Sequence, residues 1–209
     1  MIILNKLKSI SAIFLIAIFI FGCGKSYSPK TEKYIESINR ERAHNDSLME
    51  FAQNSPFNFK SKVEFHKLKY FDVDTNFIFK SKFYTYPKFD TLTIYGTKGE
   101  ARETVRIGYL NLNYKQSIYK LNVYESKTGN GKIYHGIWFT DKTTNKETYG
   151  VGRYIDFKLN ADSNYVYKID FNKAYNPYCA YSPAYSCAIP TKEDFLNFRV
   201  TAGEKKFHD

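Results

Sequence analysis

The segment from residue 147 to residue 181 gathers side chains that could recognise a small ligand. The candidate binding residues are Arg153, Tyr154, Asp156, Asp170, Asn172, Tyr175 and Asn176. An arginine can hold a carboxylate or phosphate through two parallel hydrogen bonds, and a tyrosine offers a flat face with a polar tip. The segment therefore predicts a site for a small anionic or sugar-like ligand. The same residue types also serve purely structural roles, since Arg–Asp pairs fix loops and Asn before Pro caps turns.

Catalytic chemistry has weaker support. The sequence contains no serine-nucleophile elbow, no phosphate-binding glycine loop and no HExxH helix. Four acids could supply a carboxylate pair for hydrolysis: Asp141, Glu147, Asp156 and Asp170. His135 alternates with Ile133 and Ile137, which predicts a histidine facing the core. The catalytic residues stay unassigned, and the sequence implies no cofactor.

Two cysteines, Cys179 and Cys187, lie eight positions apart near the C-terminus. In an oxidising compartment they could form a disulfide, which would contribute somewhat under about 3 kcal/mol by loop entropy. They could instead be two buried thiols that pack as small apolar side chains. A metal site is disfavoured, because the two-residue spacing of a zinc knuckle is missing and the nearest histidine is His208.

The N-terminus reads as an export signal. Lys6 and Lys8 precede an almost wholly apolar run over residues 10–21, which is shorter than the roughly 20 residues of a bilayer span. The run ends in Ile-Phe-Gly-Cys at residues 20–23, which resembles the lipobox of bacterial lipoproteins. That resemblance implies removal of residues 1–22 and acylation of Cys23, with residues 23–30 as a flexible tether. We expect a protein of the cell envelope, anchored by lipid to the outer or the inner membrane.

The chain has a formal net charge of +10. For an exported protein this points away from nucleic acid and suits anionic lipid headgroups or an acidic polymer. Because the lysines do not form one block, the charge also fits a surface that only maintains solubility.

One helix and a series of strands must position the candidate residues. Mixed charge around a thin apolar stripe, with Ser55-Pro56 as a stop, predicts a helix over residues 31–54. Alternating apolar residues predict strands over 76–84, 89–95, 105–113, 117–124, 132–140, 153–159, 165–171 and 195–201. The chain from 31 to 209 is therefore expected to form a single mainly-β domain, an antiparallel β-sandwich or barrel with one N-terminal α-helix.

Several motifs resemble one bacterial and archaeal family. They are TYG-x-GRY at 148–154, DFN-x-AYNP-x-CAY at 170–181, a Cys and a Pro at 187 and 190, and AGE at 202–204. Ser55-Pro56-Phe57, Lys69-Tyr70-Phe71 and Asp74 extend the likeness upstream. Together they resemble the family catalogued as domain of unknown function 1684, although Thr191 stands where a second proline is common. The resemblance implies a domain identity and no assigned activity.

These observations predict a membrane-anchored envelope lipoprotein whose domain binds a ligand, or has a structural role, without catalysis. One alternative is an envelope hydrolase that works through carboxylates. Another is an interaction module that docks onto a larger membrane complex or another envelope protein.

Overall fold

The computed structural model describes residues 26–60, 62–127 and 131–208. The expected leader peptide, the lipidation site at Cys23 and the first part of the tether lie outside these residues. Within the described ranges, no helix is long and apolar enough to cross a membrane.

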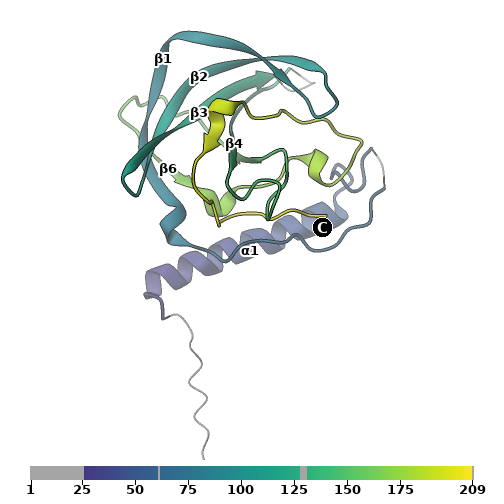
Figure 1. Cartoon of the computed structure of the whole chain (residues 1–209). Coiled ribbons are helices and arrows are strands. Elements are labelled where there is room, and N and C mark those ends of the chain that lie inside the picture. The colour runs from purple at the N-terminus through teal and green to yellow at the C-terminus, as the bar shows by residue number, and fades with distance from the viewer. Residues whose placement is uncertain (1–25, 61, 128–130, 209) are drawn as a thin grey trace, which may run out of the picture.

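The helix α1 (Pro29–Phe51) confirms the predicted N-terminal helix, with both ends shifted toward the N-terminus. Ser28 caps it by accepting a hydrogen bond from the Thr31 N–H at 3.2 Å. Pro29 follows at the first helical turn, where its missing N–H removes no helical hydrogen bond. Along α1 the buried residue is Ile38, so the helix lies along one edge of the domain, as its thin apolar stripe predicts (Figure 1).

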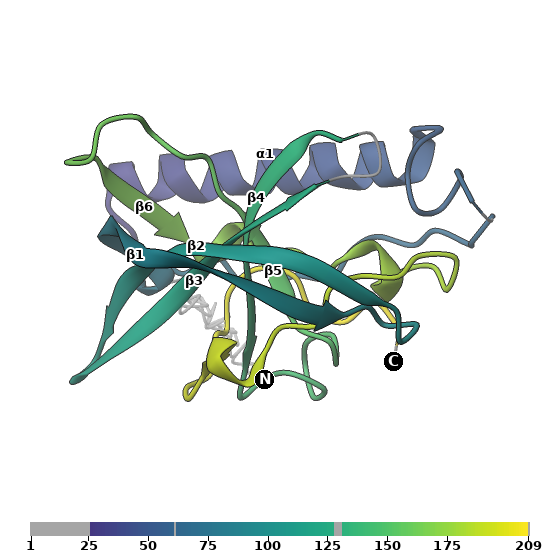
Figure 2. The same cartoon turned by 90° about the horizontal axis from the view of Figure 1, so that it is seen from above.

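The strands form one seven-stranded sheet that curls into a half-barrel (Figures 1 and 2). They are β1 (Ile78–Tyr95), β2 (Ala101–Tyr114), β3 (Ser117–Lys127), β4 (Ile133–Asp141), β5 (Arg153–Asp156), β6 (Val166–Asp170) and β7 (Phe195–Leu196). The order is β5-β4-β3-β2-β1-β6 with antiparallel neighbours, and β7 pairs in parallel with β4. The predicted mainly-β, antiparallel architecture with one helix is thus confirmed.

The core fills the concave side of the half-barrel with alternate residues of the central strands. Leu110, Leu112, Val123, Ile137 and Phe139 are almost fully buried there. The short 3₁₀ helices η1 (Thr75–Phe77), η2 (Phe171–Lys173), η3 (Tyr178–Ala180) and η4 (Lys192–Asp194) connect the later elements. They leave the C-terminal segment folded across one end of the sheet (Figure 1).

Four of the predicted strands were wrong in their bounds. The two strands expected over 76–84 and 89–95 are one strand, β1, because the segment between them shifts the register between Thr85 and Asp90 without ending the strand. The strand expected over 153–159 ends at Asp156, and the one over 195–201 pairs only through Phe195 and Leu196.

His135 does not face the core. It lies partly exposed on β4, with its Nε2 3.0 Å from the Glu125 carboxylate on β3. Ile133, its expected neighbour on the same face, is also exposed, because β4 extends past the covered part of the sheet at this end. Ile137 is buried as expected.

Candidate functional site

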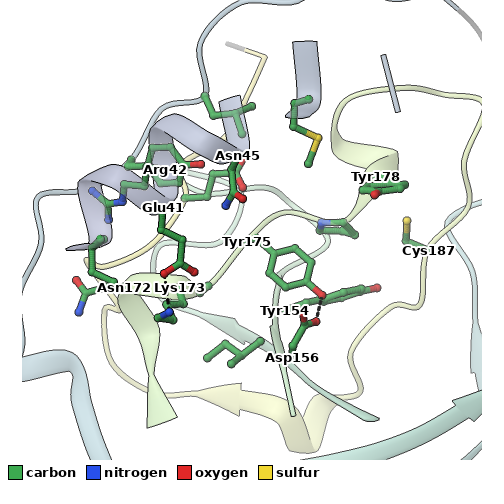
Figure 3. Close-up of a pocket in the computed structure, with 18 of the residues that line it drawn as sticks. Glu41, Arg42, Asn45, Tyr154, Asp156, Asn172, Lys173, Tyr175, Tyr178 and Cys187 are labelled. Atoms are coloured by element: carbon green, nitrogen blue, oxygen red, sulfur yellow. Dashed lines mark hydrogen bonds and ion pairs between the residues drawn. The ribbon is translucent and has the colours of Figure 1, made fainter. Parts of the chain in front are cut away.

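A cavity of about 920 Å³ lies between α1, β5 and the loop over residues 172–187. We call it the α1 cavity, because α1 forms one wall through Ile38, Glu41, Arg42, Asn45 and Met49. Tyr70 packs against α1, and tyrosines from several other segments form much of the opposite wall: Tyr134, Tyr154, Tyr175, Tyr178 and Tyr185. The volume lies within the range of small-molecule sites. Figure 3 shows the helix wall facing the tyrosine wall.

Asp156 is the polar centre of the tyrosine wall. Its Oδ1 accepts hydrogen bonds from the hydroxyls of Tyr134, at 2.8 Å, and Tyr175, at 2.5 Å. The two hydroxyl oxygens lie 3.0 Å apart. Burial raises the pKa of both tyrosines well above the usual value, and the nearby Asp156 carboxylate raises it further. Both phenols therefore stay protonated and act as donors to a carboxylate that is itself exposed.

Backbone pairing fixes Tyr175 in this position. The Tyr154 N–H donates to the Tyr175 carbonyl at 2.9 Å, and the Tyr175 N–H donates back to the Tyr154 carbonyl at 3.0 Å. Tyr154 and Asp156 lie two residues apart on β5, so both side chains point to the same side of the strand. The loop is thereby held against the strand that carries the carboxylate.

Two cations line the cavity, Arg42 on α1 and Lys173 at the end of η2. Lys173 Nζ lies 2.5 Å from Glu41 Oε2. Arg42 Nη1 donates to the Phe71 carbonyl at 3.0 Å, and its guanidinium lies 4.5 Å from the centre of the Tyr70 ring. The buried Nε and Nη2 of Arg42 have no hydrogen-bond partner among the described residues. Burial lowers the pKa of Arg42, while the surrounding tyrosines and acids favour its charged form. These contacts tie α1 to the rest of the domain.

Glu204 lies at the buried end of the cavity. Its Oε1 accepts from Asn176 Nδ2 at 2.9 Å and from the Tyr181 hydroxyl at 2.6 Å. Its Oε2 accepts from the Asn176 N–H at 3.0 Å. Burial raises the pKa of Glu204 to about 7, although the hydrogen bonds from Tyr181 and Asn176 act in the opposite direction. Near neutral pH this carboxyl group is therefore partly protonated.

Arg153 lies outside the cavity, on the core side of β5. Its Nη2 donates to Asp141 Oδ2 at 2.8 Å and to the Val200 carbonyl at 2.9 Å. Its Nη1 donates to the Ala202 carbonyl at 2.5 Å. Burial lowers the pKa of Arg153, and the Asp141 carboxylate opposes that shift. Arg153 thus fixes the C-terminal segment to β4 and β5.

The other predicted residues divide between cavity and scaffold. Tyr154, Asp156, Asn172 and Tyr175 line the cavity, whereas Arg153, Asp170 and Asn176 do not. Asp170 caps η2 and accepts from the Tyr34 hydroxyl at 2.8 Å. The Asn172 amide is engaged by the backbone of Asp74. A ligand-binding role for these residues stays a prediction.

The prediction missed the helix wall and Tyr134. Ile38, Arg42, Asn45 and Met49 recur at helical spacing, so Arg42 and Asn45 lie on the same side of α1 as the apolar residues Ile38 and Met49. That shared side was the signal in the sequence that could have identified Arg42 and Asn45 as cavity residues. Tyr134 gave none, because its approach to Asp156 depends on the pairing of β4 with β5.

Cys179 and Cys187 are free thiols in the structure, both partly buried. The Cys179 N–H donates to Cys187 Sγ at 3.2 Å, so the two residues lie in contact. Among the described residues, no group of three or more His, Cys, Asp or Glu side chains is arranged to hold a metal ion.

The cavity offers an acceptor carboxylate, fixed phenol donors and several aromatic faces. Comparison with known proteins adds the family and the fold. No curated protein matches the sequence. A solution NMR structure of an uncharacterized protein, from the gene locus rrnAC0354 of Haloarcula marismortui, is similar in fold, with a TM-score of 0.60 and 24% sequence identity. The match covers 84% of this chain and 96% of that one. The model of the family described as protein of unknown function (DUF1684) matches residues 63–205, and the chain belongs to that family.

Proposed function

We propose that this protein is a lipid-anchored domain of the cell envelope that binds a small sugar-like ligand in the α1 cavity without transforming it. The observation that carries the ligand class is the Asp156 carboxylate, fixed by Tyr134 and Tyr175 on a wall of aromatic side chains. Carboxylates accept hydrogen bonds from sugar hydroxyls, and the faces of tyrosine rings offer flat apolar contact to the sugar ring.

Charge favours a neutral ligand over an anionic one. Of the two cations that line the cavity, Lys173 is paired with Glu41. Arg42 is held through Nη1 by the Phe71 carbonyl and by the Tyr70 ring, while its Nε and Nη2 have no hydrogen-bond partner among the described residues. Asp156 would repel an anion at the opposite wall, and a neutral polyhydroxylated ligand avoids that repulsion.

Binding is preferred over hydrolysis because of how the cavity carboxyls are held. The pKa of Glu204, about 7, would suit a general acid. Both of its oxygens, however, already accept hydrogen bonds from Asn176 or Tyr181. Glu41 pairs with Lys173, which leaves Asp156 as the acid presented to a ligand.

The anchoring part of the proposal rests on the sequence around Cys23. Labelling cells with a palmitate analogue should mark the wild-type chain and leave a Cys23→Ser variant unmarked and released from the membrane fraction. Equal membrane association of both chains, without label, would contradict lipid anchoring.

Calorimetry tests the ligand class. The purified protein would be titrated with glucose, galactose, N-acetylglucosamine and the anion glucuronate. A charged hydrogen-bond partner is worth about 1.5–3 kcal/mol, so Asp156→Asn should weaken binding of a neutral sugar roughly 10- to 100-fold. Asp162→Asn, in an exposed turn outside the cavity, is the matched control. Binding that Asp156→Asn leaves unchanged, or that prefers glucuronate, would contradict the proposal.

A further inference from the structure

Cys179 and Cys187 lie at the two ends of a loop beside the α1 cavity. Cys179 belongs to η3, and Cys187 lines the cavity itself. The Cys179 N–H donates to Cys187 Sγ at 3.2 Å. Both side chains are only partly buried, so the pair is within reach of solutes.

Contacts with the turn after β1 hold Cys187 in place. The Thr97 N–H donates to the Cys187 carbonyl at 3.0 Å, and the Cys187 N–H donates to Thr97 Oγ1 at 3.3 Å. Arg102 Nη2 donates to the neighbouring Ser186 carbonyl at 2.9 Å and pairs with Glu100, which also accepts from Ser186 Oγ at 2.8 Å, so both charges of an ion pair hold this end of the loop.

Tyr149 approaches Cys179 from another segment. Its hydroxyl lies 3.6 Å from Cys179 Sγ and 3.2 Å from the Cys179 carbonyl, in position to donate to both. Burial and the adjacent Cys179 raise the pKa of Tyr149, so the hydroxyl keeps its proton. A hydroxyl donor directed at a sulfur stabilises the thiolate over the thiol.

The surroundings make the two thiols unequal. Hydrogen bonds from the Cys187 thiol and from Tyr149 lower the pKa of Cys179 below its ordinary value, against the opposing effect of burial. The hydrogen bond with Cys179 and burial raise the pKa of Cys187, although the Cys179 N–H that donates to Cys187 Sγ acts in the opposite direction. The thiolate of the pair is therefore held mainly on Cys179. Such an arrangement separates an attacking from a resolving cysteine.

We propose that Cys179 and Cys187 form a thiol–disulfide exchange pair, in which Cys179 attacks a small disulfide-bonded compound and Cys187 resolves the product. The Cys179 thiolate bonds to one sulfur of the compound, whose S–S bond breaks and whose second sulfur leaves as a thiolate and takes up a proton from water. Cys187 then loses its proton and attacks Cys179 Sγ, and the remaining half leaves as a thiol with that proton. Two protein thiols are oxidised and one disulfide is reduced to two thiols.

Thiol–disulfide exchange does not require the sugar-like ligand. The disulfide formed would nevertheless alter the tyrosine wall, which is the wall that this ligand is proposed to contact. Tyr178 precedes Cys179, and Tyr185 lies within the loop. A bond between the cysteines would close this loop and restrict both rings at the cavity.

Alkylation of the native protein followed by peptide mass spectrometry tests the inference. Trypsin cuts after Lys173 and Lys192, so both cysteines fall in one peptide and Cys23 in another. In the reduced protein, iodoacetamide should modify Cys179 with a pH midpoint clearly below the ordinary value of about 8.5, and Cys187 only at higher pH. As the ratio of oxidised to reduced glutathione in the buffer rises, the peptide should change reversibly from the doubly alkylated form to a form that carries no alkyl group and contains a Cys179–Cys187 disulfide.

Variants separate the two roles. Cys187→Ser should accumulate a mixed disulfide with glutathione on Cys179, whereas Cys179→Ser, the matched control, should acquire little on Cys187 over the same time. Tyr149→Phe should raise the alkylation midpoint of Cys179. Ordinary midpoints near about 8.5 for both wild-type thiols would overturn the proposal. So would a bond that excess reduced glutathione cannot open, because that bond would be purely structural. The wild-type measurements decide even if a variant fails to fold.

Discussion

Arg153 and Asp141 form an ion pair with 2.8 Å between Nη2 and Oδ2, and each side chain is only 1% exposed. Breaking such a pair leaves an uncompensated buried charge, at a cost of about 3–5 kcal/mol. We therefore expect Arg153→Met to lower the free energy of unfolding by that amount in urea titrations. Arg40→Met removes an exposed partner of Glu36 and serves as the control. It should change stability by less than about 0.5 kcal/mol. Equal effects of the two changes would contradict the structural role of Arg153.

Glu204 should make stability depend on pH. Its pKa is about 7 in the folded protein, against an ordinary value of 4.5. Below pH 4.5 the carboxyl group is protonated in both states and carries no penalty. As the pH rises from 4.5 to 7, the unfolded state ionises first, so folding loses up to roughly 3 kcal/mol, and above pH 7 the loss is constant.

Glu204→Gln isolates this effect. The variant loses some hydrogen bonding at every pH, but it cannot ionise. The difference in unfolding free energy between variant and wild type should therefore shift in favour of the variant between pH 4.5 and 7. A difference that stays flat over this range would show that the carboxyl group titrates normally.

Gly203 should not tolerate a side chain. Its φ is +78°, and a Cβ would lie 2.6 Å from the carbonyl oxygens of both Ala174 and Phe171. Gly203→Ala should cost about 3 kcal/mol or more, from left-handed strain together with the clash. Gly99 has a similar φ of +83° with nothing near its Cβ position. Gly99→Ala should thus cost only about 1–2 kcal/mol, and thermal denaturation of both variants would show whether the clash adds to the strain.

Asp194 is a buried acceptor shared by β3 and η4. It accepts from Asn122 Nδ2 at 2.9 Å, from the Tyr124 hydroxyl at 2.8 Å and from Thr191. Asp194→Ala leaves these buried donors without their acceptor and should cost about 2–4 kcal/mol by chemical denaturation. The adjacent Glu193 is exposed and pairs with Arg106. Glu193→Ala should cost under about 1 kcal/mol, and a comparable loss would contradict the assignment.

The contact between α1 and the sheet should be the first to open. Ile38 is the buried residue of α1, so its attachment depends on polar contacts such as Tyr34 with Asp170. Hydrogen exchange should show lower protection in α1 than in β3. Tyr34→Phe should lower protection in α1 further while leaving β3 unchanged, and a uniform loss in both would indicate that the helix opens only with the whole domain.

Local patterns in the sequence were enough to predict the helix and most strands. Alternation along residues 117–124 predicted a strand there, and Leu121 and Val123, on one face of that strand, are buried in the core. The same method divided β1 in two, because a register shift around Pro87 and a true turn look alike without the partner strand. It also extended β7, since apolar residues such as Phe198 and Val200 are buried without strand pairing.

The site was harder to predict because its partners are distant in sequence. Arg153 can serve a ligand or a scaffold equally well, and only the fold brings the Val200 and Ala202 carbonyls to it. Tyr175 and Asp156 were both candidates, yet their shared hydrogen bond depends on how the loop pairs with β5. Residue type thus identified candidates, and tertiary pairing decided their roles.

The pairing of β6 with β1 has a consequence for the order in which the protein folds. The hairpins from β1 to β4 join strands that are neighbours in sequence, so they can form early and locally. Ile78 and Asp170, by contrast, pair across a long stretch of chain, and closing that loop has a larger entropic cost. Three residues of the tyrosine wall and both cysteines follow β6 in the sequence, namely Tyr175, Tyr178, Tyr185, Cys179 and Cys187. During synthesis, the binding and redox chemistry proposed here would arise only after the hairpin framework is complete.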